Sequence, residues 1–256
     1  MSYRRSWIIS VIIYLILLVI WELIARANTQ PGSLWPSPVT VAEVLWEERE
    51  TFVSNAAVTL TEATLGFVGG VILAALFSLL SMFSRPLGDN LYRLSLVLYG
   101  LPLIAVAPLL VVWIGPGLWT KVIIALLASF FPVLVNTTQA IRHTDPKAIE
   151  MMDSLGASRL QTLWRVRLPY ALPALIASFK VAGPGAIIGA MLAEWVGAEK
   201  GLGLLVLFSM FSYLIPLLWA TLIVSSALSL TVYYTFEWVG RRLFPWHPSS
   251  QRIEEL

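Results

Sequence analysis

Apolar runs of about twenty residues alternate with short polar segments along most of the chain. A helix needs about 20 apolar residues to cross the hydrocarbon core of a bilayer, so each run is a candidate membrane span. The pattern predicts six spans, at Trp7–Ala25, Ala56–Phe83, Tyr92–Ile114, Leu118–Ile141, Leu172–Val196 and Ile215–Val239. The expected fold class is therefore all-α: a polytopic membrane protein in which residues 1–256 form a single transmembrane domain.

The first apolar run follows Arg4 and Arg5, an arrangement that secretory signal peptides share. This run is longer than the usual apolar core of a signal peptide, and no cleavage site of small residues follows it closely. We therefore interpret it as an uncleaved first span.

Basic residues indicate the orientation of these spans. With the N-terminus in the cytoplasm, twelve of the 17 basic residues lie inside, four lie outside, and Lys180 lies within the fifth span. The cytoplasmic ones are Arg4, Arg5, Arg85, Arg93, Arg142, Lys147, Arg159, Arg165, Arg167, Arg241, Arg242 and Arg252. The external ones are Arg26, Arg49, Lys121 and Lys200. Because cytoplasmic loops carry an excess of Lys and Arg, we expect both termini in the cytoplasm.

Composition supports a membrane protein and excludes several other classes. Hydrophobic residues make up 58% of the chain and charged residues 12%, against about 45–50% and about 25% in soluble domains. The absence of cysteine excludes disulfides and cysteine-ligated metals. The two histidines, His143 and His247, are far apart, and the net charge of +2 is not gathered into a basic patch. Neither a histidine metal cluster nor nucleic-acid binding is therefore expected.

Local signals refine the membrane region. Ser37 followed by Pro38 predicts the start of an amphipathic helix that runs to about Thr51, lies at the outer interface and serves as a structural connector. Prolines should disturb the third span at Pro102 and Pro108, and kink the fifth at Pro184.

Small residues recur at four-residue spacing in the second and fifth spans, at Gly66, Gly70 and Ala74 and at Gly185, Gly189 and Ala193. Such rows let helix backbones approach closely in a bilayer. Packing within the chain is favoured over a subunit interface.

The polar segment at residues 145–169, between the fourth and fifth spans, carries strong helix start and stop signals. Asp145 is a good N-cap with Pro146 after it, and Gly156 suits a left-handed C-cap. Ser158 and Gln161 have the spacing of a capping box that starts a second helix. Two prolines, Pro169 and Pro173, should close that helix, and three leucines are available for apolar contacts: Leu155, Leu160 and Leu163. The segment is predicted to be a rigid helix–Gly–helix elbow in the cytoplasm.

This segment resembles the EAA loop of binding-protein-dependent ABC importer permeases. The pattern of that loop is Glu-Ala-Ala, three residues, Gly, nine residues, and Ile-x-Leu-Pro. Four residues fall in register, Glu150, Gly156, Leu168 and Pro169, while Val166 replaces the isoleucine and Met151 and Met152 replace the alanines. By this resemblance, the residues that couple the chain to an ATPase are Glu150, Leu155, Gly156, Ala157, Ser158, Leu168 and Pro169.

The resemblance extends over nearly the whole chain. The segments 34–38, 131–137, 193–197 and 201–203 look like the nitrate/sulfonate/taurine branch of these permeases. Glu62 departs from the arginine common in that branch, and the run Thr59–Glu62 is closer to permeases associated with pyrimidine or other heterocyclic precursors.

The resemblance implies a type I ABC importer in the bacterial plasma (inner) membrane. Two permease copies, most simply a homodimer, would form the path, two ATPase subunits would dock beneath it, and an external solute-binding protein would deliver the solute. The chain has no G-x-x-x-x-G-K-[ST] phosphate loop. ATP and Mg²⁺ are therefore expected on the ATPase partner, with no cofactor and no catalytic residue in this chain.

Ionisable residues inside membrane spans are functional candidates by default. Glu62 and Glu194 are candidates for the translocation path, whereas Lys180 is close enough to the cytoplasmic interface to extend its ammonium group into it. Asn136, beside Thr137 and Thr138, could line the path or hydrogen-bond to a neighbouring helix, and the sequence leaves both open.

The alternative to an importer permease is a self-contained secondary transporter or channel, which commonly shows internal repeats that are not evident here. A membrane enzyme would need a convergent set of nucleophile, base or metal ligands, and none is visible in the sequence. The identity of the transported solute stays open, because similar permeases transport sulfonates, nitrate, bicarbonate, heterocyclic vitamin precursors and aromatic acids.

Overall fold

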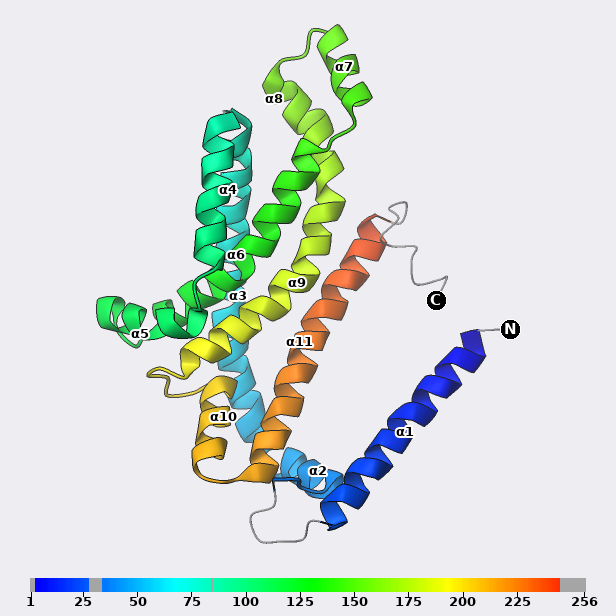
Figure 1. Cartoon of the computed structure of the whole chain (residues 1–256), viewed down its shortest axis with the longest axis vertical. Helices are drawn as coiled ribbons and strands as arrows, with labels where there is room; N and C mark the ends of the chain where they lie inside the picture. The colour runs from blue at the N-terminus through cyan, green and yellow to red at the C-terminus, as the bar shows by residue number, and fades with distance from the viewer. Residues whose placement is uncertain (1–2, 28–33, 84, 245–256) are drawn as a thin grey trace.

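The computed structural model describes residues 3–27, 34–83 and 85–244, and within these residues the chain is helical without any strand. The long helices α3, α6, α9 and α11 stand side by side, and α7 and α8 project beyond them at one end (Figure 1). The α-helices are α1 Tyr3–Ala27, α2 Pro38–Glu47, α3 Arg49–Phe83, α4 Arg85–Tyr99, α5 Leu103–Ile114, α6 Leu118–Arg142, α7 Pro146–Ser154, α8 Arg159–Thr162, α9 Leu168–Glu194, α10 Leu202–Phe211 and α11 Ile215–Leu243. A π-helical turn, η1 Leu163–Arg167, joins α8 to α9.

Four helical stretches among the described residues are long and apolar enough to cross a membrane: Arg49–Ser81, Leu118–Arg142, Arg159–Glu194 and Ile215–Leu243. They correspond to the second, fourth, fifth and sixth predicted spans. The third predicted span is wrong as a continuous helix, because α4 and α5 meet at a bend of 93°. Pro102 lies in this break and has no N–H with which to continue a helix. Pro108, which we also expected to disturb this span, is tolerated inside α5, and Pro184 is tolerated inside α9.

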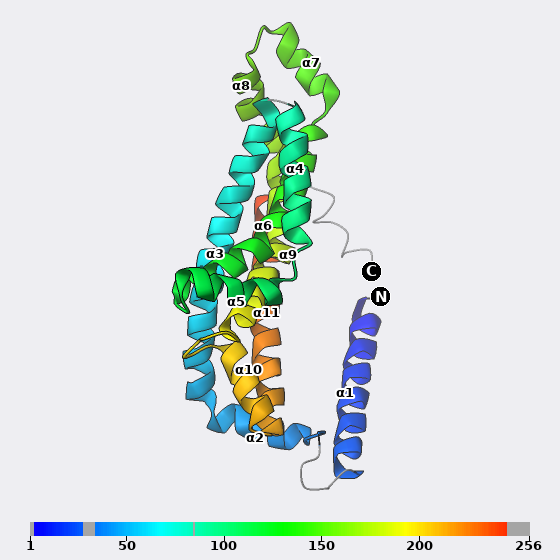
Figure 2. The same cartoon turned by 60° about the vertical axis from the view of Figure 1, so that its left-hand side comes forward.

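The first predicted span forms α1, which stands apart from the main bundle in both views (Figures 1 and 2). Its apolar side chains from Ile12 to Ile20 are mostly exposed, as expected of a helix that meets lipid. Trp21 at its far end lies 5.0 Å from the ring of Trp219 in α11. That α1 crosses the membrane, and that both termini are cytoplasmic, stay predictions, and Arg252 lies outside the described residues.

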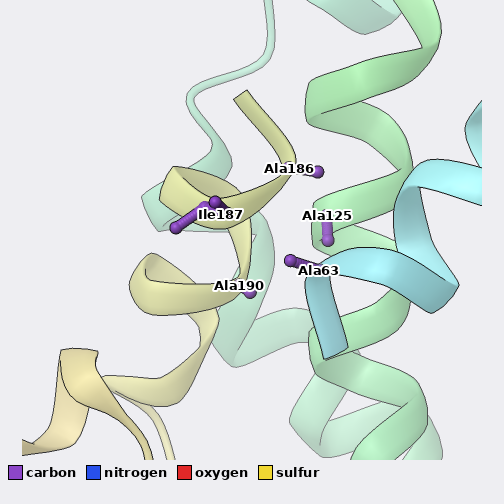
Figure 3. Close-up of a cluster of buried hydrophobic side chains, with 5 residues drawn as sticks. All are labelled: Ala63, Ala125, Ala186, Ile187 and Ala190. Atoms are coloured by element: carbon purple, nitrogen blue, oxygen red, sulfur yellow. The ribbon is translucent and has the colours of Figure 1, made fainter. Parts of the chain in front are cut away.

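Close packing of α3 and α9 against α6 forms the core of the bundle. Alanines from all three helices meet there together with Ile187, as Figure 3 shows for Ala63, Ala125, Ala186, Ile187 and Ala190. The glycine rows lie in the same contact: a Cβ on Gly66 would collide with the Cβ of Ala125, and one on Gly189 would lie 2.9 Å from that of Ala128. The prediction that these rows pack within the chain is confirmed.

The amphipathic segment begins as expected, with the hydroxyl of Ser37 accepting a hydrogen bond from the N–H of Val39. It ends at Glu47, earlier than predicted, because α3 begins at Arg49. Its apolar face packs on the protein, since Val41 is buried with Phe52, Leu205 and Ala220. These contacts tie α2 to α3, α10 and α11 and support its role as a connector. The short apolar helix α10 was missed from the sequence.

The close contact of α3 with α6 predicts that Gly66→Ala destabilises the folded chain. The added methyl group would have to displace Ala125 and the α6 backbone, and overpacking of this kind costs about 1–3 kcal/mol. Thermal denaturation of the purified protein in detergent measures the change. Gly117→Ala is the matched control: a Cβ there meets nothing within 4 Å, and φ is −75°. Equal stability of the two variants would contradict this account of the core.

Candidate functional site

The first candidate site is the elbow, residues 145–169, whose first arm is α7. The carboxylate of Asp145 accepts a hydrogen bond from the N–H of Lys147 at 3.0 Å, and Pro146 is the first helical residue. The arm ends at Gly156, which adopts φ +70°. Non-glycine residues rarely adopt this left-handed conformation, so the direction of the next arm depends on Gly156.

The second arm begins at Ser158, as the sequence predicts. The Ser158 hydroxyl accepts a hydrogen bond from the N–H of Gln161 at 3.3 Å, and the Gln161 side chain accepts one from the N–H of Ser158 at 2.8 Å. This reciprocal capping box fixes the start of α8 immediately after the turn.

The prediction that Pro169 and Pro173 close this second helix is wrong. The helical path continues from Arg159 through η1 into α9 and reaches Glu194. In the π turn, the N–H of Leu168 donates to the carbonyl of Leu163, five residues earlier. This wider turn accommodates Pro169, which has no N–H of its own to donate, so the chain turns into the span without a break.

The elbow presents apolar side chains at its outer end. Leu155 is 72% exposed, Leu160 57% and Trp164 63%. Leu163 was also expected to be available for contacts, but it is buried against the protein and is not. Of the predicted coupling residues, five are exposed and two, Ala157 and Leu168, are half-buried; the exposed ones are Glu150, Leu155, Gly156, Ser158 and Pro169.

The second candidate site is a buried polar cluster at the other end of α9. Glu194 is fully buried, and one of its carboxylate oxygens accepts a hydrogen bond from the hydroxyl of Thr59 in α3 at 2.6 Å. Its other oxygen accepts a hydrogen bond from the N–H of Gly203. The Thr59 hydroxyl in turn accepts one from the N–H of Leu202 at 2.9 Å. Glu194 and Thr59 therefore hold the first residues of α10 against α3 and α9.

The turn before α10 needs glycine for this arrangement. Gly201 adopts φ +135°, and a Cβ there would collide with the Glu194 carboxylate. The N–H of Gly201 also donates to the side-chain oxygen of Asn55 at 2.7 Å. The sequence signal for the turn was the Gly201-Leu202-Gly203 run, but its pairing with Glu194 could not be read from spacing alone.

Two of the three predicted path residues meet in this cluster. Glu62 is 4% exposed, and its carboxyl lies beside that of Glu194 where α3 contacts α9. Among the described residues, no hydrogen bond reaches the Oε2 atom of Glu62. Lys121 is also buried and donates to the carbonyl of Pro116 at 2.6 Å, and its ammonium group is near enough to Glu62 to attract the carboxylate electrostatically.

Asn136 lies apart from this cluster. It is exposed, and its amide donates to the carbonyl of Pro132 on its own helix at 2.8 Å. In the part of the chain that the structure describes, no group of three or more acidic or histidine side chains is placed to hold a metal ion.

Known proteins match both the sequence and the fold. Residues 66–245 match the family described as "Binding-protein-dependent transport system inner membrane component". A probable ABC transporter permease protein of Haemophilus influenzae is 33% identical over 90% of this chain and 94% of its own length. The formylaminopyrimidine transport permease protein ThiX of Halalkalibacterium halodurans is 32% identical over 91% and 93%. A chain of a solved amino acid ABC transporter superposes with a TM-score of 0.65 at 19% identity, over 77% of this chain and 96% of its own.

The buried cluster predicts that Thr59→Val destabilises the protein while Thr59→Ser does not. Valine keeps the shape of threonine but leaves the Leu202 N–H and a Glu194 oxygen without their partner, at a cost of about 1–3 kcal/mol. Hydrogen exchange of residues 201–203 and thermal denaturation measure the effect.

Thr61→Val is the matched control for this test. The Thr61 hydroxyl is exposed and donates only to the carbonyl of Ala57 on its own helix. An unchanged exchange rate at residues 201–203 in Thr59→Val would show that the hydroxyl does not hold this turn.

Proposed function

The chain belongs to the family of binding-protein-dependent transport system inner membrane components, and we propose that its elbow is the site at which a separate ATPase subunit docks. Membership of this family confirms the resemblance seen in the sequence and makes the chain a permease subunit of an ABC importer rather than an enzyme. It also sets aside the alternative of a self-contained secondary transporter. The docking proposal rests on the structure of the elbow. Both of its helices are capped, and apolar side chains are exposed at its tip. Its second helix continues without a break to Glu194.

The proposed mechanism follows from the stiffness of this path. In this mechanism the ATPase binds to Leu155, Leu160 and the helix around Glu150. Its own conformational change on ATP binding and hydrolysis then moves the elbow. Because α8, η1 and α9 are continuous, displacement of the elbow moves α9 as a lever. The far end of α9 carries Glu194, whose hydrogen bonds hold the start of α10. ATP hydrolysis at one end would thereby reposition the turn at the other.

The partners follow from the same arrangement. Each chain offers one elbow, so we propose a complex of two permease copies, two ATPase subunits and an external solute-binding protein. ATP and Mg²⁺ bind to the ATPase in this proposal. Residues 1–256 act as one permease domain in the bacterial plasma membrane, with both termini and the elbow in the cytoplasm, in accord with the basic residues of the elbow, Lys147, Arg159, Arg165 and Arg167.

The solute that we propose is a small heterocycle of the pyrimidine-precursor type. Support comes from the relative named for formylaminopyrimidine transport, which is more similar to this chain than the permeases named for aliphatic sulfonate and taurine transport, at 28% and 26% identity. The purified solute-binding partner, titrated with pyrimidines and with sulfonates, tests this assignment. Tight binding of a sulfonate alone would contradict it.

Coupling through the elbow predicts that Gly156→Val abolishes ATP-dependent uptake while the chain still inserts and folds. Valine at φ +70° costs about 1–3 kcal/mol of backbone strain. A Cβ at this position meets nothing within 4 Å, so the effect arises from the backbone alone. Reconstitution with the ATPase and the binding protein, followed by measurement of subunit retention, ATP hydrolysis and uptake, tests this expectation.

Two control variants distinguish the effect of backbone strain at position 156 from the effect of added side-chain volume. Gly156→Asn should retain most uptake, because asparagine tolerates the left-handed region better than valine. Gly117→Val adds the same side chain at φ −75° and should leave coupling intact. Normal uptake per ATP in Gly156→Val, with normal assembly, would show that the elbow is not the coupling element.

The proposed orientation predicts that a cysteine at position 147 is protected from a membrane-impermeant thiol reagent in intact cells, whereas one at position 200 is labelled. The parent chain has no cysteine, so each single variant reports one position. Permeabilised cells supply the positive control. Labelling of position 147 from outside would overturn both the topology and the docking site.

A further inference from the structure

A crevice between α9 and α11 lies outside both candidate sites. About 340 Å³ of space free of protein atoms lies over its walls, open solvent at its mouth included. The two helices run side by side here (Figure 1). Its walls combine apolar groups, including Ile176 and Phe236, with three charged side chains: Lys180, Glu237 and Arg241.

The charges in the crevice leave a net positive site. Glu237 is paired with Arg241 at 2.7 Å, so this carboxylate is already neutralised. Lys180 is half-buried, and its ammonium group contacts the ring of Tyr233 at 5.9 Å from the centroid. Within the described residues, Lys180 makes neither an ion pair nor a hydrogen bond. It is therefore available to a negatively charged ligand.

The crevice lies at the C-terminal end of α11, one of the helices long and apolar enough to cross a membrane. Arg241 and Arg242 are in the last turn of α11, and the exposed Trp238 stacks against Arg242 with the guanidinium 5.6 Å from its ring centroid. Tryptophan and basic residues mark the level of lipid headgroups. A ligand at this place meets Arg241 at the end of α11 and Lys180 about one turn farther along α9, with apolar groups between them.

We propose that this crevice binds the phosphate headgroup of an anionic phospholipid. The lipid phosphate would lie between Lys180 and Arg241, and an acyl chain would follow the apolar walls beside Ile176 and Phe236. Basic pockets between membrane helices suit such headgroups. The bound lipid would link α11 to the half of α9 that leads from the elbow. The proposal requires only that Arg241 lies at a membrane boundary, and it stands independently of ATPase docking.

Native mass spectrometry of the purified transporter tests the site. The protein is titrated with phosphatidylglycerol, with phosphatidylcholine of the same acyl chains, and with inorganic phosphate. Phosphatidylglycerol should be retained at one molecule per chain in preference to phosphatidylcholine. Lys180→Gln should weaken its retention about five-fold, the effect expected for one basic residue near the headgroups. Lys180→Arg keeps the charge and should retain the lipid.

Lys200→Gln is the matched control, because it removes an exposed lysine remote from the crevice in sequence and should leave lipid retention unchanged. Equal retention of the two lipids, or equal losses in Lys180→Gln and Lys200→Gln, would overturn the proposal. Displacement of phosphatidylglycerol by inorganic phosphate at similar concentrations would also overturn it, because the site would then recognise a free anion rather than a lipid.

Discussion

The close packing of α3 and α9 against α6 determines where the other helices and the buried polar residues can lie. In a bilayer, lipid competes with side chains for apolar contact, so helices associate through close packing of their backbones. Gly66 and Gly189 provide that closeness on α3 and α9, at contacts where a methyl group would collide with α6 or lie 2.9 Å from it. Once both helices lie against α6, Thr59 of α3 reaches Glu194 of α9. The polar cluster therefore depends on glycine at positions 66 and 189, where a side chain would hold the helices apart.

The same packing supports the mechanical role that we propose for α9. A helix held along its length by α6 can transmit displacement between its ends, whereas a loosely packed helix would bend. One end of this helix continues into the elbow, whose direction depends on the left-handed conformation of Gly156. The other end carries Glu194, which holds the Gly201–Gly203 turn. Glu62 and Glu194 are buried side by side, so two carboxyl groups lie at the point that the lever would move.

Local signals in the sequence predicted local structure well. The caps at Asp145 and Ser158 and the left-handed Gly156 were predictable because each depends on neighbouring residues alone. The continuity from α8 to α9 was not predictable from the sequence. Pro169 is a helix-ending signal unless a wider turn precedes it, and no residue pattern indicates that turn. The bend between α4 and α5 was only half foreseen: Pro102 marked a disturbance, but its 93° angle depends on packing. The contact between Glu62 and Glu194 joins residues far apart in the chain, which spacing cannot reveal.

The claim that the elbow and α9 move as one body is tested most directly by a distance within one chain. Spin labels at positions 147 and 199 would report the separation of the elbow from the loop after α9, in a chain with no native cysteine. Labelled chains diluted with unlabelled ones in the assembled transporter would be measured with and without ATP. The account predicts an unchanged distance distribution within the chain in both states. A shift of about 5 Å, the rise of one helical turn, would show that the elbow flexes and would contradict the lever.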